Sequence, residues 1–280
     1  MVFNALQAQV MLKYNLKKGD SFVMEQKTLQ TLSQSYLGIT EEIETEITGT
    51  VLFKVVDHST DTFKLDISFT SAHMKMSSSS SGVISESSSK SKDDTFENKI
   101  FRGLIGRVFT LTLDNRGKVL KMENGESLIN GMLYALELTD EVQIKSFRNL
   151  MLKDWGESAL ADTFEQLFFN YPNGMIKEGD SWKNEFISKS EWNAQNHWRL
   201  DSVSDDSNTI LCTADIFLET KNDSVEMKVS GTQETELIAD SETGLPLIMK
   251  IISTAEGTNK APSLPEFPIT IVTKTIYKKL

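Results

Sequence analysis

The chain has 280 residues, of which 39% are hydrophobic and 25% are charged. These fractions are those of a globular protein, and the length allows a sizeable core in one large domain or in two fused halves. The net charge of −11 repels phosphate backbones, so nucleic acid is not expected as a partner. No apolar run approaches the roughly 18 residues of a membrane-spanning helix, so no transmembrane segment is expected.

The first ten residues, 1–10, contain the letters ALQAQ, which resemble the small-residue end of a secretory signal peptide. The charged start and the apolar stretch of such a signal are missing. This segment is therefore predicted to be the remnant of a trimmed signal peptide or a disordered end.

Residues 11–123 are predicted to form a first β half, because apolar residues recur there with period two. In TFKLDISFT the side chains of Phe63, Leu65, Ile67 and Phe69 share one face, which is typical of a half-buried antiparallel strand. The segment VFTLTLDNRGKVLKM reads as a hairpin that turns at residues 114–117. The serine-rich stretch 77–94 offers little to bury and is predicted to be a mobile loop.

Residues 124–174 are predicted to be helical, because apolar residues there lie three and four positions apart. Leu160, Phe164, Leu167 and Phe168 form one such stripe, and Pro172 with Gly174 ends it. Residues 175–280 return to alternation and are predicted to form a second β half, so the whole chain is expected to be a single folded unit.

The two β halves begin with nearly the same six letters, KKGDSF at Lys17–Phe22 and KEGDSW at Lys177–Trp182. Each half also contains a hairpin with an acidic turn that includes glycine. This pattern favours a diverged internal duplication. We therefore predict a mainly β (α+β) fold in which two related antiparallel halves form a curved sheet or half-barrel, with the central helical segment packed on it.

A catalytic interpretation of the hexapeptides would need Asp20 and Asp180 to meet as a carboxylate pair, and a turn-forming role is favoured over it. The three histidines, His58, His73 and His197, have no partner nearby in sequence, so structural or solvent-exposed roles are favoured over catalysis.

Metal and cofactor sites are not expected either. The single cysteine, Cys212, precludes an internal disulfide and reads as a buried strand residue rather than a nucleophile. The usual zinc spacings, a phosphate loop and a dinucleotide fingerprint are all missing. An acidic strand face could hold calcium, but a solvated face is favoured for it; its members are Glu41, Glu42, Glu44 and Glu46.

Three longer segments resemble secreted Bacteroidetes families that are labelled only as domains of unknown function. They are LKYNLKKGD at Leu12–Asp20, LIGRVFTLTLDNRGKV at Leu104–Val119 and YPNGMIKEGDSW at Tyr171–Trp182. The resemblance implies a periplasmic or extracellular location in a bacterial cell envelope, and it carries no catalytic residues. A weaker fold analogy is with lipoprotein carriers, in which helices cover a curved antiparallel sheet.

Two apolar segments, FRGLIGRVF and FEQLFFNYP, either pack sheet against helix or line a cavity for a lipid or other amphipathic ligand, and simple packing is the favoured interpretation. The candidate lining residues are Phe101, Leu104, Ile105, Phe109, Phe164, Leu167 and Phe168.

The sequence thus predicts a non-enzymatic cell-envelope protein that binds a lipophilic or amphipathic ligand. A structural or protein-interaction module with an envelope partner is the first alternative. A hydrolase is the second, and it would require a cleft that combines a histidine with a carboxylate.

Overall fold

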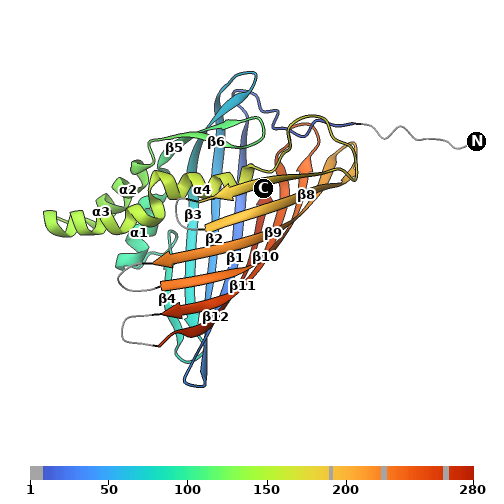
Figure 1. Cartoon of the computed structure of the whole chain (residues 1–280). Coiled ribbons are helices and arrows are strands. Elements are labelled where there is room, and N and C mark those ends of the chain that lie inside the picture. The colour runs from blue at the N-terminus through green and yellow to red at the C-terminus, as the bar shows by residue number, and fades with distance from the viewer. Residues whose placement is uncertain (1–8, 189–191, 222–225, 261–264) are drawn as a thin grey trace, which may run out of the picture.

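A computed structural model describes residues 9–188, 192–221, 226–260 and 265–280. Residues 1–8, which belong to the segment predicted to be a signal-peptide remnant or a disordered end, lie outside the described part of the chain. Most of the described chain is β-strand, arranged in one antiparallel sheet of 12 strands that does not close (Figure 1). The predicted fold class is therefore confirmed.

The first half of the chain contributes six strands to this sheet. They are β1 (Ser21–Tyr36), β2 (Ile39–His58), β3 (Thr62–Ser78), β4 (Gly82–Ser88), β5 (Val108–Asp114) and β6 (Val119–Glu123). The second half contributes β7 (Ser181–Ile187), β8 (Trp192–Val203), β9 (Ser207–Lys221), β10 (Glu226–Asp240), β11 (Pro246–Lys260) and β12 (Phe267–Lys279).

The strand order is β6-β5-β3-β2-β1-β12-β11-β10-β9-β8-β7, and β4 pairs with β3 outside this path. The two halves meet where β1 pairs with β12, over the register from Met24 opposite Lys279 to Gln34 opposite Ile269. In this order the strand numbers fall from β6 to β1 across the first half and from β12 to β7 across the second. The first strands of the two halves, β1 and β7, are therefore separated by β12, β11, β10, β9 and β8.

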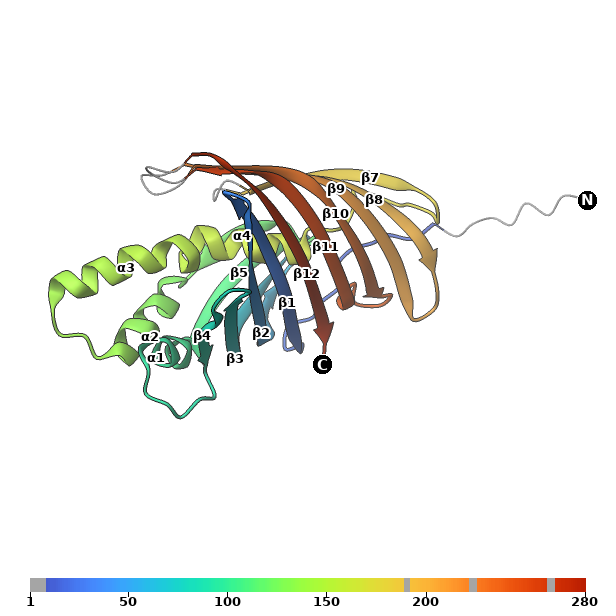
Figure 2. The same ribbon diagram turned by 90° about the horizontal axis from the view of Figure 1, so that it is seen from below.

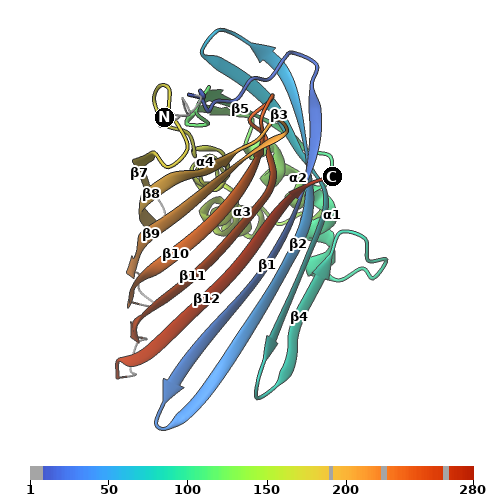
Figure 3. The ribbon, with the colours of Figure 1, turned by 90° about the vertical axis from the view of Figure 1, so that its right-hand side faces the viewer.

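Four helices follow one side of the sheet: α1 (Phe96–Leu104), α2 (Glu126–Leu136), α3 (Glu141–Trp155) and α4 (Glu157–Phe168). Helix α4 lies in the hollow of the curved sheet, whereas α3 extends away from it (Figure 2). Viewed from the right-hand side of Figure 1, the sheet presents its strands in front and the helices behind them (Figure 3). The sheet therefore has a concave face, partly covered by helices, and an outer face that is open.

The two hexapeptides form equivalent turns. The Oδ2 atom of Asp20 accepts a hydrogen bond from the backbone N of Lys17 at 2.7 Å, and Oδ2 of Asp180 accepts one from the backbone N of Lys177 at 3.0 Å. Gly19 and Gly179, each just before the aspartate, have φ of 99° and 88°, a conformation that only glycine adopts without strain. In both halves, an aspartate and a glycine thus form the same turn at the start of a strand.

Two buried tyrosines connect the halves and the helices. The hydroxyl of Tyr14 donates to the carbonyl of Phe168 at 3.0 Å, and the hydroxyl of Tyr171 donates to the carbonyl of Gly244. Their ring centroids are 4.9 Å apart. Burial raises the pKa of Tyr14 and of Tyr171, so both phenols stay protonated donors. These contacts fix the end of α4 against the N-terminal segment and the β10–β11 turn.

Two parts of the first half differ from the prediction. Helix α1 lies in the segment 11–123, where strands and a serine-rich loop were expected. Thr95 caps this helix by accepting from the backbone N of Asn98 at 3.2 Å. The serine-rich stretch 77–94 was predicted to be a mobile loop, but it includes strand β4. Hydrogen bonds take the place of apolar packing in this stretch, because Ser78 and Ser80 each donate to Oε1 of Glu41 at 2.7 Å.

Candidate functional site

A cavity of ≈240 Å³ lies between the concave face of the first half and the helices. Its walls come from β1, β2, β3 and, through Tyr277, β12 on the sheet side, and from α1, α3 and α4 on the helix side. Most of its surface is apolar; the lining includes Met24, Ile47, Val51, Phe53, Phe69, Met74, Phe101, Trp155, Leu160, Phe164, Leu167 and Tyr277. An apolar cavity of about 150 Å³ is enough to hold benzene, so this one has room for part of an apolar ligand.

Aromatic rings form much of the cavity wall. Phe53 meets Phe164 edge to face, with ring centroids 5.9 Å apart, and Phe69 meets Trp155 in the same manner at 5.8 Å. Trp155 is the last residue of α3, which contributes no fully buried residue. The helix side of the cavity therefore combines α4, whose Leu160, Phe164 and Leu167 are buried, with α3, which is less buried.

The predicted lining residues divide into two groups. Phe101, Phe164 and Leu167 line the cavity. The other four do not. Leu104, Phe109 and Phe168 are buried in the packed core, and Ile105 is half-buried just after the end of α1.

Sequence reasoning missed the sheet side of the cavity, which Met24, Val51 and Phe69 help to form. The period-two alternation places these residues on the inner face of their strands, but alternation does not show which inner positions meet a helix and which meet a cavity.

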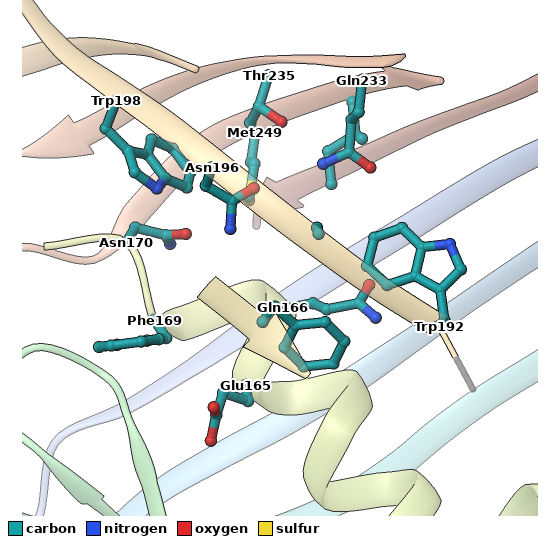
Figure 4. Close-up of a pocket in the computed structure, with 13 residues that line it drawn as sticks. Glu165, Gln166, Phe169, Asn170, Trp192, Asn196, Trp198, Gln233, Thr235 and Met249 are labelled. Carbon is teal, nitrogen blue, oxygen red and sulfur yellow. The ribbon is translucent and has the colours of Figure 1, made fainter. Parts of the chain in front are cut away.

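A second, smaller cavity of ≈30 Å³ lies on the other side of α4 (Figure 4). It is lined by more polar side chains, among them Asn170, Asn196 and Gln233. Asn170 is 1% exposed, and its Oδ1 atom has no hydrogen-bond partner among the described residues. This volume suits a water molecule or one polar group, either of which could satisfy that oxygen.

Glu165 also borders the small cavity. Burial raises the pKa of its carboxyl, although the backbone N of Val119 donates to it at 3.1 Å and favours the charged form. The carboxylate is thus engaged with strand β6, and its contact explains how α4 is held against that edge of the sheet.

The catalytic alternatives find little support in the described residues. The Nε2 atom of His73, which borders the large cavity with Asp154, lies 3.0 Å from Oε1 of Glu86. No hydroxyl or thiol in the described part of the chain hydrogen-bonds to a histidine ring. This histidine–carboxylate pair is therefore all that the structure offers to the hydrolase alternative.

The remaining candidates serve structural roles. Cys212 is buried, and burial raises the pKa of its thiol to about 12, so it is a poor nucleophile at neutral pH. Asp20 and Asp180 are each bound by their own turn and start strands that lie far apart in the sheet order. Among the described residues, no group of three or more His, Cys, Asp or Glu side chains is placed to hold a metal ion.

The chain belongs to a family of unknown function, DUF6263, whose model matches residues 60–246. None of the curated proteins compared with the chain matches it. In the described part of the chain, no helix combines the length and apolar character needed to span a bilayer.

Among solved structures, the fold is similar to part of lipovitellin, from a structure described as lipid–protein interactions in lipovitellin. The TM-score is 0.56 at 7% identity, over 95% of this chain and 25% of the lipovitellin chain. The chain thus spans about a quarter of the length of that protein. This likeness concerns the fold alone.

Two membrane-protein structures have lower scores. An outer membrane channel from Pseudomonas putida F1 gives a TM-score of 0.25 at 7% identity, covering 95% of this chain and 97% of the channel. The translocator domain of the autotransporter NalP from Neisseria meningitidis gives 0.21 at 5% identity, covering 95% and 90%. Scores this low carry no argument about this chain.

Proposed function

We propose that this protein is a non-enzymatic carrier that holds an apolar or amphipathic ligand against the concave face of its sheet. The observation that supports this most directly is the ≈240 Å³ cavity lined by aromatic and aliphatic side chains beneath α3 and α4. A ligand in this position would bury apolar surface at about 25 cal/mol per Å², which is the main source of affinity in sites of this kind.

The likeness to a segment of lipovitellin supports the same proposal by analogy, because that structure is described in terms of lipid–protein interactions. The analogy is limited to the fold. We also propose, on the family resemblance of its sequence motifs, that the carrier works in a bacterial cell envelope. Cell fractionation with an antibody to the protein would test that location, and recovery in the cytoplasm would contradict it.

The cavity proposal can be tested by filling the cavity. Ala72 lines it from β3, directly opposite Gly49 of β2. In Ala72→Phe the added ring would occupy the space proposed for the ligand, so we expect affinity for the apolar fluorophore N-phenyl-1-naphthylamine to fall at least about tenfold. Fluorescence titration gives the dissociation constants.

Lys54→Phe is the matched control, because it adds the same ring at an exposed position of β2. It should leave binding unchanged, and circular dichroism would show whether both variants fold. The carrier proposal fails if the wild-type protein does not bind the fluorophore, or if Ala72→Phe binds it as tightly as wild type.

A protein-interaction module is a second candidate, favoured by the tip of the β1–β2 hairpin. Leu37 and Ile39 are 82% and 73% exposed there, and such side chains at a projecting tip suit contact with a partner. Leu37→Ser with Ile39→Ser should leave fluorophore binding unchanged and would weaken partner binding only if this candidate is correct.

A further inference from the structure

The concave face carries a continuous row of uncharged polar side chains that crosses the strands. Each strand from β2 to β7 in the sheet order contributes one residue to this row, and each of these residues pairs with the row residue of the neighbouring strand. The row consists of Thr45, Gln30, Thr273, Ser253, Gln233, Ala214, Asn196 and Asn184. Ala214 is its only apolar member, so the pattern extends over eight neighbouring strands.

The rows on either side of this polar row are more apolar. The row nearer the helices contains Thr28, Thr275, Ile251, Thr235, Cys212, Trp198 and Trp182. The row farther from them contains Leu32, Ile271, Ala255, Gly231, Ile216, Ala194 and Phe186, most of which belong to or pack on a second buried cluster. This polar row, the polar belt, thus lies between a row without polar side chains and a row that mixes threonines with apolar residues.

No charged residue occurs in any of these three rows. The outward positions of the same strands are different, since Glu234, Lys274 and Asp215 alternate with the row residues on β10, β12 and β9. A charged group placed on the half-buried part of the belt would lose part of its water and find no opposite charge in the rows, which is unfavourable. The carboxylate of Glu165, which borders the small cavity, already accepts a hydrogen bond from the backbone N of Val119. An uncharged polar group would find hydroxyl and amide partners instead.

Several groups along the belt have hydrogen-bonding capacity to spare. The side chains of Gln233 and Ser253 form no hydrogen bond with any described residue, and Oδ1 of Asn170, which lines the small cavity together with Gln233, is buried and unpaired. By contrast, Nε2 of Gln30 donates to Oγ1 of Thr273 at 3.3 Å, and Nδ2 of Asn196 donates to Oδ1 of Asn184 at 2.9 Å.

A cavity beside the polar belt offers space for a ligand group. A cavity of ≈130 Å³ is lined by Gln30, Ser253 and Thr273 of the belt, and by apolar residues that include Ile216 and Ile271 of the row beyond it. On the helix side, Ile47 lines the larger cavity and lies two residues from Thr45 of the belt, on the same face of β2. The belt therefore begins next to the cavity in which we place the apolar part of the ligand.

We infer that the ligand is an amphipathic molecule with an uncharged, hydrogen-bonding head, such as a glyceride, a fatty amide or a long-chain alcohol. Its hydrocarbon chain lies in the helix-covered cavity and its head lies on the polar belt. This inference rests on the proposed carrier function and adds the chemical class of the ligand to it.

The test compares two lipids with the same acyl chain and no net charge, 1-oleoylglycerol and 1-oleoyl-lysophosphatidylcholine. Because neither carries net charge, the protein's charge of −11 does not discriminate between them. Each lipid competes with bound N-phenyl-1-naphthylamine, whose apolar rings we place in the helix-covered cavity. We expect 1-oleoylglycerol to bind at least about tenfold more tightly, because the second lipid must desolvate a phosphate and an ammonium group.

The double variant Gln30→Leu with Gln233→Leu removes two amides from the belt while keeping side-chain size similar. We expect affinity for 1-oleoylglycerol to fall about tenfold, with fluorophore binding unchanged. Gln195→Leu is the matched control, because it makes the same change at an exposed, outward position of β8. It should alter neither affinity.

The outcomes separate the two proposals. If the fluorophore binds but 1-oleoylglycerol has no advantage, or if the double variant keeps that advantage, the headgroup inference is overturned and the carrier proposal stands. If the wild-type protein does not bind the fluorophore, the carrier proposal is overturned and the inference falls with it.

Discussion

The two halves of this protein start alike and are completed differently. After equivalent turns, Phe22 of β1 pairs with Phe53 of β2, and Trp182 of β7 pairs with Trp198 of β8. The rings are stacked in both pairs, with interplanar angles of 8° and 10°. The same strand start therefore delivers the same kind of aromatic pair to the concave face of each half.

The surroundings of the two pairs differ. Phe22 and Phe53 are buried, and Phe53 lies under Phe168 of α4 with ring centroids 5.6 Å apart. Trp182 lies on the edge strand β7, is half-buried, and donates from Nε1 to the carbonyl of Asn170 at 3.0 Å. One pair is part of a dry core beneath a helix, whereas the other needs polar partners.

This difference follows from where the helices pack. Their main contacts with the sheet are with β3, β4, β5 and β6, all of the first half. A duplicated strand pattern can thus serve two purposes: one copy forms the covered core, and the other extends the open concave surface that carries most of the polar belt.

The largest expected effect comes from truncating the covered pair. Phe53→Ala should reduce the free energy of unfolding by about 3–5 kcal/mol, because it removes a fully buried ring and leaves a cavity. Trp182→Ala should cost roughly half as much, since its ring is only half-buried. Urea denaturation followed by circular dichroism measures both. Equal losses would contradict the distinction between a covered and an open half.

A smaller effect is expected from the glycines of the turns. Gly117 has φ of 94°, and an added Cβ would collide with the carbonyl of Phe168 and lie 2.8 Å from Cε2 of Tyr14. Gly19 has φ of 99° but faces open space. We expect Gly117→Ala to cost about 2–4 kcal/mol of unfolding free energy and Gly19→Ala about 1–2 kcal/mol.

The same denaturation series gives this comparison. If Gly19→Ala were the costlier change, contact with the end of α4 would not be what constrains the Gly117 turn.

The smallest effects should come from the acidic residues of the two starting turns. Asp20→Ala and Asp180→Ala each remove one exposed hydrogen bond to a backbone N–H, so each should cost about 1 kcal/mol. The two losses should be similar and should add in the double variant, because the turns share no contacts. A marked departure from additivity would show that the two carboxylates interact, as the catalytic-pair interpretation requires.

Local features of the fold were accessible from the sequence. Asp114 with Gly117 and Asp20 with Gly19 predict turns, because the carboxylate accepts backbone N–H groups and glycine adopts positive φ. The alternation in Phe63, Leu65 and Ile67 predicts a strand with one buried face, and all three are buried. The short helix α1 and strand β4 were not predicted, because nine and seven residues of mixed composition give too weak a periodic signal.

The candidate site was only partly accessible. Phe101, Phe164 and Leu167 line the large cavity, yet Leu104, Phe109 and Phe168 have the same chemical character and lie in the packed core. No property of the residue type separates the two groups. The separation depends on where α3 and α4 stand away from the sheet.

By itself, the sequence determined the β class, the two related strand starts, the helical interruption and the inward-facing positions, because these depend on backbone angles and on neighbours a few residues apart. The tertiary structure decided the rest. Gln30, Thr273, Ser253 and Gln233 become one polar row only because β1 pairs with β12, and β12 in turn leads to β11 and β10. The β1–β12 pairing joins residues more than 200 positions apart. No short turn links these two strands, so their register depends on burying the apolar residues of the inner face.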